Sequence, residues 1–168
     1  MNKKKQRIAP DKIHLTGIRI LKSHFEVDTS TMDESSAIHS FQTGLKSESG
    51  HNLDDNYQLF SLFVKIQGLD ADEKLIGVNA EYHIDFHYFI DNLGDFITKD
   101  DKSEEFLLGS DLGATLAGIS YSTCRGIILD RTQTTDFNGL ILPVINPLKL
   151  IEEDTFTEMS NDKGLKST

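Results

Sequence analysis

The chain has 168 residues, a formal net charge of −10 and one cysteine, Cys124. Its length suits one domain with a sizeable core, and an acidic protein has no general attraction to the phosphates of nucleic acids. No apolar run approaches the roughly 20 residues of a membrane span, and a lone cysteine favours a reducing compartment. We therefore expect a cytoplasmic protein that neither binds nucleic acid nor inserts into a membrane.

The first half of the chain shows the alternation of β-strands. Residues 1–12 begin with a basic stretch that no apolar segment follows, which predicts a disordered start rather than a secretory signal. Residues 13–27 alternate in part and predict the first strand. Residues 28–56 are rich in Ser, Asp, Asn and Gly, so we expect a loop or crossover there, with a short strand near residues 37–42.

Two longer strands are predicted at residues 57–67 and 75–90. The turn between them is short, so the two strands should form an antiparallel pair. Residues 91–110 are expected to be a polar connection.

A long helix is predicted at residues 111–132. Its apolar face contains Leu116, Ile119, Cys124, Ile127 and Ile128. Its three glycines each cost about 1 kcal/mol relative to alanine. The small residues near its start would allow another helix to approach closely. The alternative is a kinked core helix within one subunit.

A second, short helix should begin after Asn146. The Asn side chain is a good N-cap, and Pro147 follows at the first helical position, where its missing N–H has no cost. The preceding residues 140–145 are apolar, but Pro143 favours an edge or irregular strand. Residues 155–168 are expected to be a flexible tail. Four strands followed by two helices indicate an α+β domain at residues 13–154, with a four-stranded antiparallel sheet packed with two C-terminal helices.

The alternation in the last strand separates a polar face from a core face. Glu81, His83, Asp85 and His87 lie on one face, whereas the intervening aromatic and aliphatic residues point to the core.

No constellation in the sequence assembles a catalytic or metal site. His83 and His87 lie about 13 Å apart on a strand, too far to share one Zn²⁺ with ligands at about 2 Å. Residues 118–122 miss the nucleophile elbow because Ser122 replaces its final glycine. Cys124 lies on the apolar helix face without a nearby histidine and is expected to be an inert core thiol. We predict no enzyme activity, no cofactor and no metal.

The end of the chain resembles the SecB family of bacterial protein-export chaperones. The resemblance rests on an ungapped order of residues that match the family's Arg, aliphatic pair, Phe, leucines and Asn: Arg125, Ile127, Ile128, Phe137, Leu140, Ile141, Leu142 and Asn146. Gly126 departs from the family's Glu, and Pro143 lies one residue early. The strand and helix order over residues 13–151 also matches the family's layout.

The resemblance implies an ATP-independent holdase chaperone that binds unfolded or extended polypeptide, assembled as a homotetramer (a dimer of dimers). Its clients would be export precursors or a dedicated antitoxin, and the divergent motif favours the specialised client. The motor SecA would be a second partner, docking at an acidic sheet face that contains Glu81 and Asp85. The mildly acidic tail, with two lysines near its end, matches the family's SecA-binding tail poorly.

Two sets of site residues follow from this resemblance. The predicted client-binding residues are Phe41, Leu45, Leu140, Leu142, Leu148 and Ile151. The predicted oligomer-interface residues are Gly118, Cys124, Arg125 and Ile128. The alternatives are a structural subunit of a larger assembly and a small α+β enzyme.

Overall fold

The computed structural model describes residues 7–30, 37–99, 106–152 and 159–162, with side chains up to residue 151. Four long strands form its main layer: β1 (Ile13–Val27), β2 (Ser40–Asn52), β3 (Tyr57–Leu69) and β4 (Leu75–Ile90). They are antiparallel in the order β1-β4-β3-β2, and a short strand, β7 (Met159–Asp162), extends the sheet at the edge of β2. The predicted four-stranded antiparallel sheet is confirmed.

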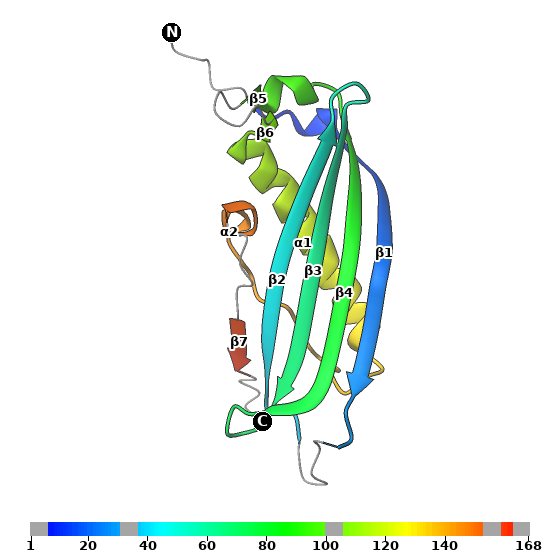
Figure 1. The fold of residues 1–168 in the computed structure, drawn as a ribbon, viewed down its shortest axis with the longest axis vertical. Coiled ribbons are helices and arrows are strands. Elements are labelled where there is room, and N and C mark those ends of the chain that lie inside the picture. Colours follow the sequence, from blue (N-terminus) through cyan, green and yellow to red (C-terminus); the bar gives the residue numbers. More distant parts are fainter. Residues whose placement is uncertain (1–6, 31–36, 100–105, 153–158, 163–168) are drawn as a thin grey trace.

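One long helix, α1 (Ser110–Thr132), crosses one face of this sheet obliquely (Figure 1). A short helix, α2 (Pro147–Glu152), packs on α1 beside β2. The connection between β4 and α1 begins with a 3-10 turn (Leu93–Phe96) and holds a small hairpin, β5 (Ile97–Lys99) with β6 (Phe106–Leu108). The predicted polar connection thus contains structure of its own. The fold class is α+β.

The alternation of β4 explains which face α1 covers. Every second residue from Ile76 to Ile90 is buried, and the residues between them are partly exposed or exposed on the opposite face. On β3 the same core face runs from Gln58 to Ile66. The largest fully buried side chains are aromatic: Tyr88, Phe41, Phe60, Phe86 and Phe137. The prediction that Glu81, His83, Asp85 and His87 share the other face is confirmed.

The turns between the strands are built by local polar groups. In the β3–β4 turn, the Asp70 carboxylate accepts hydrogen bonds from the backbone N–H groups of Asp72 at 2.8 Å and Lys74 at 2.9 Å. Glu73 there and Asn56 in the β2–β3 turn have positive φ angles. Tight turns of this kind fix the register of both hairpins.

The expected short strand near residues 37–42 overlaps the start of β2, but the loop expected after it is wrong, because the strand continues to Asn52. Residues 31–36 lie outside the described part. β2 has 13 residues and pairs with β3 along its whole length, from Ser40 opposite Leu69 to Asn52 opposite Tyr57. The polar and glycine-rich end of β2 has weak strand propensity by itself. Pairing with the strongly alternating β3 supplies the stabilisation that its own residues lack.

Three other expectations concern the two ends of the chain and the segment before α2. Residues 7–12 end in a 3-10 turn (Pro10–Lys12), while residues 1–6 lie outside the described part. Residues 140–146 form no regular strand. Within the expected tail at 155–168, β7 pairs with β2, and the rest of that segment lies outside the described residues.

Candidate functional site

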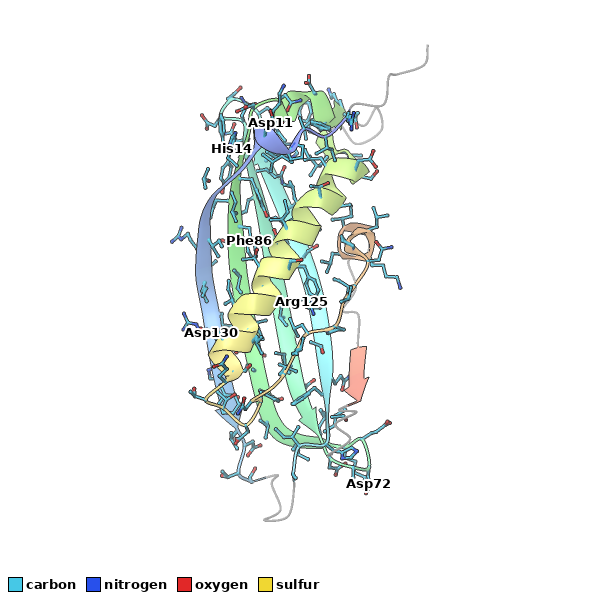
Figure 2. All side chains as sticks on the ribbon, turned by 180° about the vertical axis from the view of Figure 1, so that it is seen from behind. Asp11, His14, Asp72, Phe86, Arg125 and Asp130 are labelled. Atoms are coloured by element: carbon cyan, nitrogen blue, oxygen red, sulfur yellow. The ribbon has the colours of Figure 1, made fainter. Side chains whose placement is uncertain are left out.

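Residues 140–146 run along α1 as an irregular extended segment held by two side chains of the helix. The Arg125 Nε–H donates to the carbonyl oxygen of Leu142 at 2.8 Å, and the Tyr121 hydroxyl donates to that of Pro143 at 2.7 Å. Figure 2 shows Arg125 on the side of α1 that faces this segment. These bonds replace the ladder that a strand would provide, so the backbone of the segment is fixed without a neighbouring strand.

The side chains of this segment divide between the core and the surface. Leu140 and Leu142 are 2% and 1% exposed, whereas Ile141 is 57% and Val144 is 84% exposed. Leu148 in the first turn of α2 is 36% exposed. We call Ile141, Val144 and Leu148 the apolar flank.

The start of α2 follows the predicted capping pattern. The Asn146 side-chain oxygen accepts a hydrogen bond from the Leu148 N–H at 3.1 Å, and Pro147 is the first helical residue. The predicted cap is confirmed. Because the cap fixes the first turn, it also fixes the position of Leu148 relative to Val144.

Small residues of α1 allow α2 to pack closely against it. A Cβ atom added at Gly118 would lie 3.5 Å from Pro147, and one added at Gly113 would lie 3.2 Å from Ile151. The close helix approach suggested by these glycines therefore occurs within one chain.

The helix α2, which carries Leu148 of the apolar flank, contacts the edge strand β2. The Ser47 hydroxyl of β2 donates to the carbonyl oxygen of Leu150, which connects α2 directly to this strand. An extended polypeptide at this corner would meet both an exposed apolar side chain and the main chain of a sheet edge.

The six predicted client-binding residues differ in their exposure to solvent. Phe41, Leu45, Leu140 and Leu142 are each at most 2% exposed and form part of the core, whereas Leu148 and the half-buried Ile151 reach the surface. Ile141 and Val144, which are more exposed than any of the six, were not among them. Residues 140–145 are apolar throughout, so no sequence pattern distinguishes the exposed side chains of this segment from the buried ones.

The predicted interface residues all have neighbours within their own chain. Cys124 and Ile128 are fully buried in the core beneath the sheet. Arg125 donates a hydrogen bond to the carbonyl oxygen of Leu142, and Gly118 packs close to the Pro147 ring. A role for these four residues between subunits stays a prediction.

Another exposed apolar surface lies on β1, the other edge strand of the sheet. Leu15, Ile18 and Ile20 lie on the helix-side face, opposite core residues of β4, yet they are 37–40% exposed. Leu21 beside them is 50% exposed, and Ile119 of α1 is 38% exposed. Ile18 and Ile20 lie in the first strand, as predicted for residues 13–27.

The opposite sheet face carries charges of both signs. Lys22 pairs with Glu81, and this hydrogen bond lowers the pKa of the Glu81 carboxyl. Asp85 accepts a hydrogen bond from Ser61 at 2.6 Å and lies 3.2 Å from His83 Nε2. A shallow recess of about 330 Å³ lies here, with the ring of Phe63 stacked on His83 at 4.1 Å between centroids. Docking of a partner at Glu81 and Asp85 stays a prediction.

Burial suppresses the reactivity of the one thiol. It raises the pKa of Cys124 to about 12, so the sulfur stays protonated at neutral pH. Among the described residues, no three His, Cys, Asp or Glu side chains gather as a metal site. No helix in the described ranges has the length and apolarity to cross a membrane.

The architecture, a four-stranded antiparallel sheet with a long C-terminal helix across one face, is a SecB-like fold. Among solved structures it is similar to the SecB-like chaperone of Mycobacterium tuberculosis, solved in complex with a ChAD peptide from the HigA1 antitoxin. The TM-score is 0.57 with 12% sequence identity, over 80% of this chain and 91% of that chain. No protein-family model matches the chain, and no curated protein matches it.

Proposed function

We propose that this protein is an ATP-independent chaperone that holds unfolded or extended polypeptide on the apolar flank. The observation that carries the proposal is the exposure of Ile141, Val144 and Leu148 on a backbone that α1 and the α2 cap hold in place. An apolar side chain that becomes fully buried contributes roughly 1.5–3 kcal/mol. Three such side chains on a fixed backbone can therefore support the binding of a polypeptide through apolar burial alone.

We infer that the client is one dedicated protein, of the antitoxin kind, rather than the general set of export precursors. Two observations support this choice. The similar chaperone was solved with an antitoxin peptide. The sheet face on which SecA docking was expected carries Lys22 and Lys65 beside Glu81, so it lacks the one-sided acidity that such docking would use.

Association with further copies of the chain, up to a homotetramer, belongs to the same proposal. An exposed apolar edge strand invites unwanted pairing unless another surface covers it. Leu15, Ile18 and Ile20 on β1, with Ile119 on α1, offer such a surface. A second copy packed there would remove these side chains from water.

The proposed function is tested by suppression of aggregation of a denatured model enzyme in the absence of nucleotide. We expect the wild-type protein to suppress aggregation, and Val144→Asp and Leu148→Asp each to weaken suppression about tenfold or more, because a charge in the contact costs more than the lost apolar area. The control is Leu75→Asp, at the exposed first residue of β4. Equal suppression by all four proteins would exclude the apolar flank as the binding site.

A further inference from the structure

The chain places a short piece of itself on the edge of its own sheet. β7 pairs antiparallel with the first four residues of β2, from Ser40 opposite Asp162 to Thr43 opposite Met159. β2 continues for nine more residues, to Asn52, and no other described strand pairs with its outer edge. The edge therefore accepts an extended chain, and within the described residues that chain pairs over four positions.

A four-residue strand on an edge is weakly held. Its ladder supplies few main-chain hydrogen bonds, each with a modest net contribution. Nothing in the described residues continues the pairing past Thr43. A longer extended polypeptide on the same edge would form more ladder bonds than β7 does, and would run toward Ser47, where α2 contacts β2.

We propose that the outer edge of β2 is a strand-addition site for extended polypeptide, and that β7 is a built-in competitor that must leave before the polypeptide pairs there. This inference rests on the proposed function and adds its binding mode and its regulation. Main-chain pairing at an edge gives affinity with little dependence on sequence, whereas the apolar flank selects apolar side chains. Because β7 must be displaced, a polypeptide needs more favourable pairing energy to bind, so that short or weakly pairing segments do not bind.

The competition has a quantitative consequence. When only a fraction of the molecules has a free edge, the apparent Kd rises by the inverse of that fraction. Full-length protein with Ser160→Pro and Asn161→Pro disrupts β7, because at least one of two adjacent prolines removes a ladder donor. We expect this variant to bind alkylated, permanently unfolded lactalbumin about fivefold more tightly or better. Ser167→Pro, beyond β7 in the same tail, is the control.

The opposite change locks β7 in place. Gln42 and Ser160 are register partners, and directly opposed strand residues have Cα separations that a disulfide can bridge. We expect Gln42→Cys with Ser160→Cys to bind the unfolded lactalbumin about tenfold more weakly when oxidised and like wild type when reduced. Each single cysteine variant is the control. The native Cys124 is buried and does not compete for oxidation.

The outcomes separate this inference from the proposed function. Equal affinity of the proline, locked and wild-type proteins for the lactalbumin would overturn the inference and leave the chaperone function standing. If no form binds lactalbumin, the holding of general unfolded polypeptide is excluded and only a dedicated client remains. In that case a labelled synthetic peptide of residues 157–163 decides the inference, measured by fluorescence anisotropy. Binding to the proline variant but not to the locked form supports an exchangeable edge, and no binding to either contradicts it.

Discussion

Tyr88 of β4 connects the sheet to α1 through its buried hydroxyl group. Its ring is the largest fully buried side chain, and its hydroxyl lies 2.7 Å from the Ser120 hydroxyl. Burial raises the pKa of the Tyr88 hydroxyl, which therefore stays protonated at neutral pH. The pair holds the helix at one register on the sheet, since each hydroxyl would otherwise be left in an apolar surrounding.

We expect Ser120→Ala to lower the free energy of unfolding by about 1–2 kcal/mol, because the Tyr88 hydroxyl keeps only a long contact, 3.5 Å, to the Leu116 carbonyl. Tyr88→Phe should cost a similar amount. Urea unfolding of both single variants and the double variant measures the coupling. If the two losses simply add, the hydroxyls do not depend on each other and the contact is not what fixes the register.

At the scale of the helix, the glycines of α1 have different surroundings. A Cβ added at Gly126 meets nothing within 4 Å, whereas one added at Gly113 lies 3.2 Å from the Ile151 side chain. We expect Gly126→Ala to raise the free energy of unfolding by about 1 kcal/mol, the helix-propensity gain. Gly113→Ala should gain less or destabilise, because Ile151 must move. Thermal unfolding compares the two, and equal gains would mean that α2 does not pack closely on α1.

The elements differ in how well the sequence predicted them. β4 and α1 were predicted nearly to the residue, because β4 alternates over 16 residues and α1 has a continuous apolar face. Only the start of β2 was predicted, because its second half, residues 46–52, is polar throughout apart from Gly50 and forms a strand only through pairing with β3. β7 falls in a polar segment and depends in the same way on the edge of β2.

At the scale of the whole molecule, the site was predicted only in part. The sequence indicated that residues 140–151 are apolar and that a helix begins after Asn146. It did not show which of these side chains face out. That division depends on where Arg125 and Tyr121 hold the segment against α1, a tertiary contact that no local pattern records. The burial of Phe41 and Leu45 likewise depends on tertiary structure, since the pairing of β2 places them in the core, and their contact with a client stays a prediction.

Assembly is a second property of the whole molecule. We expect native mass spectrometry of the wild-type protein to show dimers or tetramers, and Ile20→Lys to shift them toward monomers by burying a charge in the β1 contact. Leu75→Lys, at a more exposed leucine outside β1, should leave the assembly unchanged. Monomeric wild-type protein, or equal behaviour of the two variants, would contradict an interface on β1.

Direct contact between unfolded polypeptide and the apolar flank is the basis of the proposed function. A photo-crosslinking amino acid at position 148 tests it, with the same probe at position 75 as the control. With alkylated, unfolded lactalbumin and no nucleotide, we expect a strong crosslink from position 148, a weak one from position 75, and none from either position with folded lactalbumin. Equal crosslinking at both positions, or no crosslink from position 148 to the unfolded chain, would show that the apolar flank does not bind the polypeptide.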